Sequence, residues 1–398
     1  MKVKLLPLVL ALIMCAMLFA GCGQTTADDD VGASSVSQSS AQESTQPQAS
    51  ASPSSPAPSS AAASSPAASS APVSETSPAA APVPTEKTIT DMAGRTVTIP
   101  AEIKSVGTFG AIGVLNTVVL TMGAGPLIIN EGSASFVNSP SWAKYVYKFA
   151  PQIQNMPQFE NADREIIIEE VLAAAPDLCL SMSRANTEFL EQHGLTVVQI
   201  AWQQDEDVHV AIRLLGEVFD AQERAEDYLA YFDEMIAKAN ALTANVADRK
   251  TAVYGAVSRF SQPHAIAEWW IAQAGGISVT TEMIEGQESL SYTLEDLLLW
   301  NPDIMFTSSN GEVNDILADE RLSDIPAVRN NDIYSVPRIS HTWGNRTPEQ
   351  PLTILWAMNK MYPELYSNDE LKEDIRYFYS HFFNYNFSDA DLDEIVGG

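Results

Sequence analysis

The sequence predicts an α/β protein in which two similar lobes are joined by one long helix. Strand and helix patterns alternate over residues 105–201, and the alternation resumes over residues 251–336. A helical pattern without strands separates the two stretches, and one helix–turn–strand segment occurs twice. Alternation of this kind is typical of parallel sheets. We therefore expect an N-terminal α/β lobe at 87–206, a linking helix at 207–246 and a C-terminal α/β lobe at 247–398.

The first 22 residues have the features of a bacterial lipoprotein signal peptide. Lys2 and Lys4 precede the uncharged apolar stretch Leu5–Ala20, which is short for a membrane span. Leu18–Cys22 then resembles a lipobox, in which the cysteine is acylated and becomes the first residue after cleavage. Lipidation of Cys22 predicts an anchor on the outer face of the cell membrane, since two acyl chains hold stably. A plain secretory signal or a short membrane anchor is the alternative.

Residues 23–86 are predicted to be a disordered tether. From Thr25 to Thr85 the chain is mainly Ser, Ala, Pro and Gln, with no aromatic residue, Leu, Ile, Met, Lys or Arg. Such a segment cannot bury enough apolar area to offset its conformational entropy. A stalk of this length suits a domain that stands off a Gram-positive type of cell wall, and an inert spacer is the alternative.

Ordered structure is expected to begin near Lys87, where residues 89–100 predict a hairpin that turns at Ala93-Gly94. In the linking segment apolar residues recur at helical spacing, and Asp220 with Glu223 has the spacing of a capping box. A second helix is therefore expected to begin after a bend there. Apolar runs predict further strands at Ser105–Thr108, Leu127–Asn130, Asp177–Ser181, Val197–Ala201, Thr251–Val257, Asp303–Ser308 and Asp332–Val336.

The repeated segment supports two lobes. Residues 169–181 and 295–307 agree in residue type along 13 positions, at a constant offset of 126. In each copy an amphipathic helix ends, Pro-Asp forms the turn, and a buried apolar strand begins. Helix–turn–strand units of this kind are also common in other α/β proteins, which is the alternative explanation.

The charge balance excludes several classes of partner. The chain has 51 Asp and Glu residues against 22 Lys and Arg, a formal net charge of −29. Nucleic acid and anionic lipid both attract basic surfaces, so neither is expected as a partner, and membrane attachment is expected through the lipid anchor only. Cys15, Cys22 and Cys179 have no spacing typical of a disulfide framework or a zinc site, and Cys179 is expected to be buried. No resident metal or cofactor is predicted.

Five segments in order carry a family resemblance. They are ITDMAGRTVTIPAEI at 89–103, AIRLLGEVFDAQERAEDYLAYFDE at 211–234, LEDLLLWNPDIMF at 294–306, the closing segment at 333–366 and a C-terminal helix at 386–397. Together they resemble the substrate-binding proteins of ABC importers for ferric siderophores, haem and cobalamin. The resemblance implies two Rossmann-like lobes joined by a long rigid backbone helix, with a ligand cleft between the lobes. It also implies a monomer that does no chemistry and delivers its ligand to an ABC permease and its ATPase.

In this framework the ligand is expected at the carboxyl ends of the strands, where open α/β sheets bind ligands. The arginines favour an anionic metal chelate of the ferric siderophore type, since guanidinium pairs bidentately with carboxylates and stacks on rings. Histidine ligation of haem, or stacking of a corrinoid, is the alternative, and so is an ordinary surface or packing role for each residue. The candidate ligand-binding residues are Thr108, Phe109, Ser183, Arg184 and Trp202 from the first lobe and Arg259, His264, Arg338, His341, Trp343 and Arg346 from the second.

The resemblance further implies that one exposed glutamate on each lobe pairs with arginines of the permease. The helices after the two Pro-Asp strands offer Glu188 and Glu312, with Glu191 and Asp315 as rivals. Solvated surface acids are the alternative, because acidic residues are abundant.

Two other functions are weighed against an importer component. An enzyme is disfavoured, because the sequence has no H-E-x-x-H, P-loop or G-x-S-x-G motif. A ligand-binding sensor or relay would keep the cleft without serving a permease, and would not need the two docking glutamates.

Overall fold

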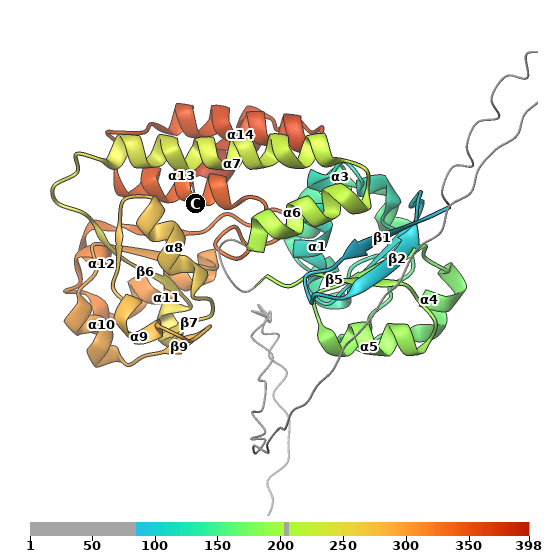
Figure 1. The fold of residues 1–398 in the computed structure, drawn as a ribbon. Helices are drawn as coiled ribbons and strands as arrows, with labels where there is room; N and C mark the ends of the chain where they lie inside the picture. The colour runs from blue at the N-terminus through green and yellow to red at the C-terminus, as the bar shows by residue number, and fades with distance from the viewer. Residues whose placement is uncertain (1–84, 203–206, 398) are drawn as a thin grey trace, which may run out of the picture. The chain divides into compact units, whose positions relative to one another are not determined.

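The computed structural model describes residues 85–202 and 207–397, in which helices cover parallel sheets (Figure 1). The predicted signal peptide, the lipidated Cys22 and nearly all of the predicted tether lie outside these residues. Among the described residues, none of the helices combines the length and apolar character needed to cross a membrane.

The first parallel sheet has the strand order β3-β4-β5. Its strands are β3 (Val106–Phe109), β4 (Leu178–Ser181) and β5 (Val197–Gln199). Every residue of β3 and β4 is buried, which is typical of parallel strands that are covered on both faces. Cys179, in β4, is buried as predicted.

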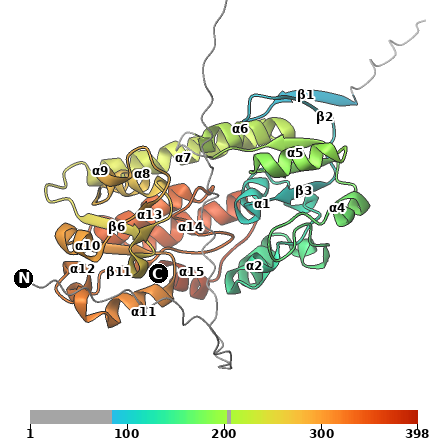
Figure 2. The same ribbon diagram turned by 90° about the horizontal axis from the view of Figure 1, so that it is seen from below.

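The predicted N-terminal hairpin is confirmed. It consists of β1 (Glu86–Thr90) and β2 (Thr96–Pro100), which pair antiparallel. The hairpin lies at the margin of the molecule beside α6 (Asp207–Val218), as Figure 2 shows.

The second parallel sheet has the order β11-β10-β6-β8. Sequence analysis predicted three of its strands and missed the short edge strand β8. A small antiparallel pair, β7 with β9, was also missed. Two separate parallel sheets confirm the predicted α/β class, while the lobe boundaries stay a prediction. The strands are β6 (Thr251–Gly255), β7 (Ser261–Gln262), β8 (Ile277–Ser278), β9 (Leu290–Ser291), β10 (Ile304–Thr307) and β11 (Ile333–Ser335).

The repeated segment forms the same local structure in both copies. Helix α4 (Ile168–Ala174) and helix α10 (Leu294–Trp300) each end at a residue with left-handed backbone, Ala175 with φ 48° and Asn301 with φ 49°. The proline that follows cannot continue a helix, and a buried strand begins two residues after it.

The aspartate of each Pro-Asp turn explains why the repeat is so regular. The Oδ2 atom of Asp177 accepts from the backbone N of Ser105 at 3.0 Å, and Asp177 N donates to Ser105 Oγ at 2.9 Å. Asp303 and Thr251 form the same reciprocal pair at 2.9 and 3.0 Å. In each sheet the turn therefore fixes the register of the incoming strand against its neighbour.

The linking segment is two helices with a bend, as predicted, although the predicted capping box is wrong. Helix α6 ends at Val218, and α7 (Gln222–Thr243) begins with Ala221 at its N-cap and no side-chain cap. Asp220 instead has φ 53° and forms an ion pair of 2.7 Å with Lys87 in the hairpin. Helix α7 alone is 22 residues, about 33 Å long.

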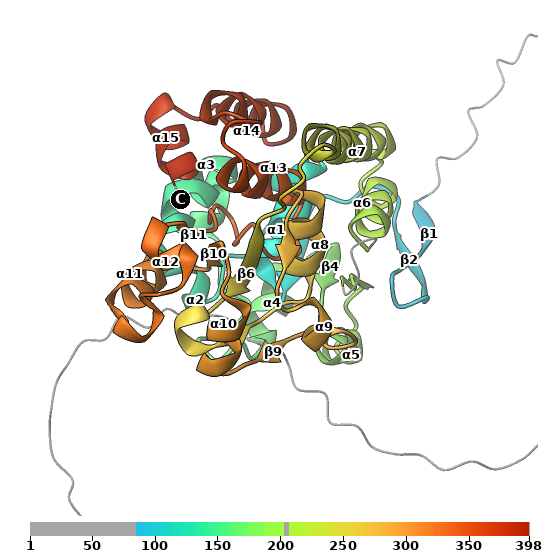
Figure 3. The same ribbon diagram turned by 90° about the vertical axis from the view of Figure 1, so that its left-hand side faces the viewer.

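Helix α7 packs along α13 (Gln350–Met361), which in turn packs on α14 (Asn368–Phe382), as Figures 1 and 3 show. The C-terminal helix α15 (Asp389–Gly397) packs on α14 and confirms the helix predicted there. The remaining helices are α1 (Ile112–Thr121), α2 (Ala134–Val137), α3 (Tyr147–Phe149), α5 (Arg184–Gln192), α8 (Ile266–Gln273), α9 (Thr281–Ile284), α11 (Asn310–Ala318) and α12 (Pro326–Asn330).

The strand predicted at Leu127–Asn130 is wrong. Only Ile128 forms an isolated parallel bridge, to Val106 at the start of β3. Two residues further on, the amide side chain of Asn130 replaces the backbone ladder. It accepts from the backbone N of Thr108 at 2.9 Å and donates to the carbonyl oxygen of Thr108 at 3.1 Å.

Candidate ligand-binding site

Segments that follow the carboxyl ends of the two parallel sheets meet at the start of α1. This helix follows β3 directly, and all 10 of its residues are buried. A Cβ added at Gly113, in its first turn, would lie 3.0 Å from the carbonyl oxygen of Ser340 and 3.1 Å from Cδ2 of His341. Ser340 and His341 belong to the loop after β11, so glycine at 113 allows the two segments to approach closely.

Two of the predicted arginines, Arg259 and Arg338, remain available for a ligand. Arg259 ends the 3-10 turn Val257–Arg259 after β6, and Arg338 follows β11. Both are exposed, and neither side chain has a hydrogen bond or ion pair with the part of the chain that the structure describes. Arg249 and Arg329 are also exposed and without such a partner among these residues, so it is their position after β6 and β11 that distinguishes Arg259 and Arg338.

The predicted residues Arg346 and His264 both bind the carboxylate of Glu288. Arg346 donates from Nη1 to Oε1 at 2.5 Å and from Nη2 to Oε2 at 2.8 Å, and His264 Nδ1 lies 3.0 Å from Oε1. Burial acts to raise the pKa of Glu288, but the hydrogen bonds and charges of His264 and Arg346 outweigh burial and lower it. The carboxylate of Glu288 thus occupies the hydrogen-bond donors of Arg346 that a ligand carboxylate would use. The ligand role of Arg346 and His264 stays a prediction.

His341 is held neutral by its surroundings. Burial lowers the pKa of His341 to about 3. The positive charges of Arg338, His264 and Arg164 act in the same direction. The loop after β11 therefore presents an uncharged imidazole within a cationic neighbourhood.

A buried carboxyl group, that of Glu160, lies beside the end of β3. Its Oε1 atom accepts from the backbone N of Gly110 at 2.6 Å, while its Oε2 atom is buried and has no hydrogen-bond partner among the described residues. Burial raises the pKa of Glu160 to about 7, against the hydrogen bond from Gly110 and the positive charge of Arg164. Near neutral pH this group therefore exchanges between a carboxylate and a neutral acid.

Arg164 is a residue of this region that sequence reasoning missed, because it does not directly follow a predicted strand. It lies in the turn between Glu160 and Ile166, which form an antiparallel bridge. Its backbone is left-handed, with φ 62°, which is uncommon for a residue of this size. The turn-forming Asn161 was the only signal in the sequence that pointed to it.

Four predicted ligand residues lie in the interior: Thr108, Phe109, Trp202 and Trp343, which are 0 to 5% exposed. The hydroxyl of Thr108 donates to Asn116 Oδ1 at 2.9 Å, and Trp343 Nε1 donates to the hydroxyl of Tyr379 at 3.3 Å. These side chains serve the packing of the protein in this structure, and contact with a ligand stays a prediction for each of them.

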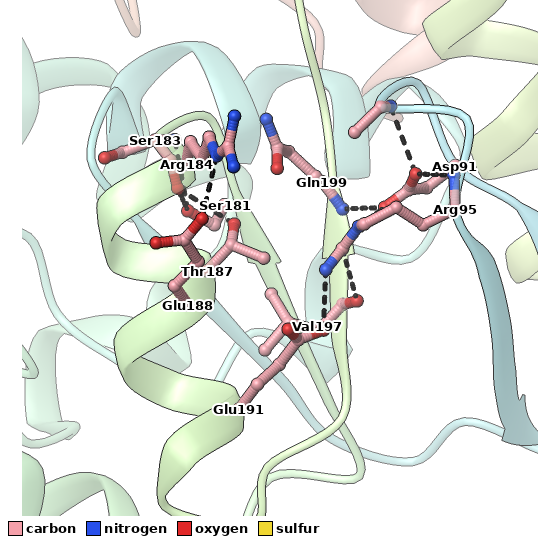
Figure 4. Close-up of polar contacts among 11 residues, drawn as sticks. Asp91, Arg95, Ser181, Ser183, Arg184, Thr187, Glu188, Glu191, Val197 and Gln199 are labelled. Carbon is pink, nitrogen blue, oxygen red and sulfur yellow. Dashed lines mark hydrogen bonds and ion pairs between the residues drawn. The ribbon is translucent and has the colours of Figure 1, made fainter. Parts of the chain in front are cut away.

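The predicted residues of α5 lie at its N-terminus, as Figure 4 shows. Ser183 is the N-cap, and its hydroxyl accepts from the backbone N of Asn186 at 3.3 Å. Arg184 is exposed and donates from Nε to Glu188 Oε1 at 2.7 Å. Glu188, the predicted docking residue, is also exposed, with 55% of its side chain accessible.

Glu191, the rival of Glu188, is engaged in the network that holds the N-terminal hairpin (Figure 4). Arg95 donates from Nη1 to Glu191 Oε1 at 2.6 Å and from Nη2 to Asp91 Oδ2 at 2.6 Å. Asp91 Oδ2 also accepts from the backbone N of Gln199 at 3.1 Å. The hairpin is thereby fixed to β5 and α5.

Glu312, the second predicted docking residue, is buried rather than exposed. It lies in the first turn of α11 at 5% exposure, and Ser258 donates to its Oε1 atom at 2.8 Å. Its rival Asp315, one turn further along α11, is exposed. The docking role of Glu312 stays a prediction, and docking through it requires this carboxylate to become accessible.

Residues 85–202 and 207–397 contain no group of three His, Cys, Asp or Glu side chains that could hold a metal ion. A metal that arrives inside a chelate is cargo, and its ligands come from the chelator.

Open parallel α/β sheets bind ligands at the carboxyl ends of their strands, which makes the segments after β3, β6 and β11 the candidate site of an α/β binding protein. Residues 142–339 match the family described as periplasmic binding protein. This part of the chain belongs to that family, in agreement with the resemblance seen in the sequence.

Similar proteins match about 70 to 80% of the chain and nearly their own full length. The molybdate-binding protein MolA of Haemophilus influenzae is 23% identical over 337 residues, which cover 76% of this chain and 92% of that protein. The structure of a periplasmic solute binding protein from Veillonella parvula is similar with a TM-score of 0.67, 21% identity, and coverage of 78% of this chain and 97% of that one. An ABC-type Fe3+-hydroxamate transport system structure from Saccharomonospora viridis gives a TM-score of 0.53, 19% identity, and coverage of 69% and 98%.

Proposed function

We propose that the protein is the extracytoplasmic solute-binding lipoprotein of an ABC importer and that it captures an anionic metal chelate of the ferric siderophore type. The observation that carries this proposal is the pair of exposed arginines, Arg259 and Arg338, which have no carboxylate partner among the described residues. Guanidinium groups bind carboxylate and catecholate oxygens through charge-assisted hydrogen bonds. The similarity to the Fe3+-hydroxamate transport structure supports a ferric siderophore in general. A ferric tris-hydroxamate carries no net charge, so the anionic character proposed for the ligand rests on the arginines alone.

A tetrahedral oxyanion is the second candidate ligand. The similarity to the molybdate-binding protein of Haemophilus influenzae extends over 92% of that protein and favours it. An oxyanion would use the same unpaired arginines, because its oxygens accept hydrogen bonds from guanidinium in the same way.

Haem is the third candidate. Haem iron would need an imidazole nitrogen, and His264, whose Nδ1 binds Glu288, keeps Nε2 for a ligand, as metal-binding histidines commonly do. The neutral state of His341 is compatible with ligation, so haem and a corrinoid are included in the test below.

Delivery would follow the pattern of a membrane-anchored binding protein. We propose that acylated Cys22 anchors the monomeric protein on the outer face of the cell membrane and that residues 23–86 act as the tether. The permease would bind the exposed Glu188 in the first half of the chain, and Glu312 or its exposed neighbour Asp315 in the second half. A sensor or relay role would use the same ligand site without these docking contacts.

The test is a titration of the full-length chain, purified in a mild detergent, with a ferric tricatecholate complex, molybdate, haemin and cobalamin. Tryptophan fluorescence reports binding. We expect saturable quenching by the ferric complex, which Arg338→Gln weakens by roughly tenfold or more. Arg329→Gln is the matched control, since Arg329 is also an exposed arginine of the second half of the chain and lies in α12.

Binding of molybdate alone would transfer the proposal to an oxyanion, and binding of haemin alone would transfer it to haem. No response to any of the four probes, from a folded protein, would contradict the proposed ligand class.

A further inference from the structure

We propose that Glu312 is a positioning residue of the ligand site: its buried carboxylate fixes the turn after β6 and thereby sets the direction in which Arg259 leaves that turn. This inference rests on the proposed function, in which Arg259 binds the ligand. It assigns Glu312 to ligand binding and leaves the permease contact of the second half of the chain to the exposed Asp315.

The turn that carries Arg259 is anchored through the two residues before it. Val257 is 0% exposed and packs in the same apolar cluster as Ile316 of α11. Ser258 is half-buried, and its hydroxyl donates to Glu312 Oε1 at 2.8 Å. Because both anchors directly precede Arg259, they fix the backbone from which its exposed side chain leaves.

The carboxylate of Glu312 also contacts the segment after β10. The hydroxyl of Ser308, the first residue after that strand, donates to Glu312 Oε2 at 3.5 Å. Strands β6 and β10 are neighbours in the second sheet, so Glu312 joins the two segments that leave their carboxyl ends. Open α/β sheets bind ligands at this edge, which places a carboxylate that joins the two segments in a position to set the geometry of the site.

The sequence around Glu312 would also allow a purely local arrangement. Residues 309–312 have the S-x-x-E spacing of a capping box, in which the glutamate accepts from the backbone N of the N-cap residue. Helices α10 and α14 form this reciprocal pair. In α11 the hydroxyl of Ser309 accepts from the backbone N of Glu312 at 3.4 Å, whereas the carboxylate extends to Ser258. The side chain thus serves a tertiary contact at a place where a local one was available.

The first half of the chain has a related arrangement. Asn186 stands 126 positions before Glu312, and it is the third residue of α5 after the N-cap Ser183. Its Nδ2 atom lies 3.9 Å from the place of a Cβ on Gly110, which directly follows β3. In both halves the third residue of the helix therefore faces the segment after the neighbouring strand. In the second half that residue is a carboxylate that accepts a hydrogen bond from this segment.

The arrangement keeps the charge of Arg259 available. Glu312 is the acid of α11 that faces the turn, and its carboxylate accepts from the hydroxyls of Ser258 and Ser308. A hydroxyl donor satisfies a carboxylate without using a guanidinium group. Glu312 therefore holds the turn while the donors of Arg259 stay free for an anion.

The experiment compares full-length Glu312→Ala, Glu312→Gln and Ser258→Ala with the wild-type chain, using the ferric tricatecholate complex and molybdate as probes. Asp315→Asn is the matched control, since Asp315 is an exposed acid of the same helix. Thermal unfolding confirms that each variant folds. We expect Glu312→Ala and Ser258→Ala to weaken binding by roughly three- to tenfold and Asp315→Asn to bind as wild type. Glu312→Gln should restore most of the affinity, because its amide oxygen can accept from Ser258.

A double-mutant cycle with Arg259→Gln separates positioning from a general structural role. If Glu312 acts through Arg259, Glu312→Ala weakens binding in the wild-type chain and has little further effect in Arg259→Gln. Equal losses in the two backgrounds would show that Glu312 acts independently of Arg259 and would contradict the inference.

The outcomes separate the inference from the function on which it rests. If wild type binds the ferric complex and Glu312→Ala binds it equally well, the inference is wrong while the proposed function stands. If Arg259→Gln binds as wild type, the inference is wrong and the proposed function rests on Arg338. If wild type binds only molybdate and the cycle shows coupling, the siderophore proposal fails and the inference is supported. If wild type binds neither probe, both are wrong. Should Glu312→Ala unfold, the cycle is carried out with Ser258→Ala, and additive losses there would overturn the inference.

Discussion

Replacing Glu160 by glutamine should remove a pH dependence from the stability of the protein. The carboxyl is 0% exposed, and burial raises its pKa from 4.5 to about 7. The folded state therefore binds this proton more tightly than the unfolded state does. The stability that Glu160 contributes is fully present below pH 4.5 and is lost as the pH rises through 7.

The size of this effect follows from the two pKa values. One pKa unit corresponds to about 1.4 kcal/mol, so the shift of Glu160 amounts to about 3 kcal/mol of stability lost between acid and alkaline pH. Glutamine does not titrate, and its carbonyl oxygen can accept the hydrogen bond from Gly110. The amide nitrogen of glutamine takes the place of the unpartnered Oε2 atom, and burying it without a partner lowers the free energy of unfolding by an amount that does not change with pH.

The assay is urea unfolding of wild type, Glu160→Gln and the exposed control Glu165→Gln, followed by tryptophan fluorescence between pH 4.5 and pH 8.5. Between pH 4.5 and pH 8.5, the free energy of unfolding of wild type should fall by about 3 kcal/mol relative to that of Glu160→Gln. Glu165→Gln should show no such trend, because Glu165 is exposed. A difference between Glu160→Gln and wild type that stays constant with pH would refute the argument.

Three further predictions concern the turn after β6, the anchor and docking. Gly255→Ala should lower the unfolding temperature strongly, because Gly255 has φ 136° and a Cβ would lie 2.3 Å from the carbonyl oxygen of Ser261. Gly286→Ala, where φ is 75° and a Cβ meets open space, should lower the unfolding temperature much less. Equal losses in the two variants would contradict the steric argument. Cys22→Ser should release the protein from the membrane fraction of cells, and a serine variant that stays with the membrane would exclude the lipid as the anchor. Glu188→Lys should abolish ligand uptake by cells while the affinity of the purified protein stays unchanged, and a fall in affinity would place Glu188 in the ligand site instead.

Sequence reasoning was most successful where a local pattern determines a local structure. The Pro-Asp turns fix the register of β4 and β10 through reciprocal bonds with Ser105 and Thr251, so the repeat could be seen at a distance of 126 residues. The bend between α6 and α7 was also predicted. The capping box at this bend was wrong, because Lys87 in the distant hairpin captures Asp220.

Sequence reasoning was weaker for the site, because position in a loop does not determine where a side chain points. Arg346 was correctly placed after β11, but its pairing with Glu288, 58 positions away, depends on the tertiary fold. Glu312 lies on the predicted helix, yet its side chain turns inward to Ser258. Arg164 escaped notice because it lies in a turn that does not directly follow a predicted strand.

The central claim is that the protein carries an anionic metal chelate, and the most direct measurement is the absorption spectrum and metal content of the full-length chain purified from iron-replete cells. We predict a visible charge-transfer band without a Soret band, iron that approaches one equivalent, and loss of both in Arg338→Gln. A Soret band or a corrinoid spectrum in the wild-type protein, or iron that is retained in full by Arg338→Gln, would contradict the account.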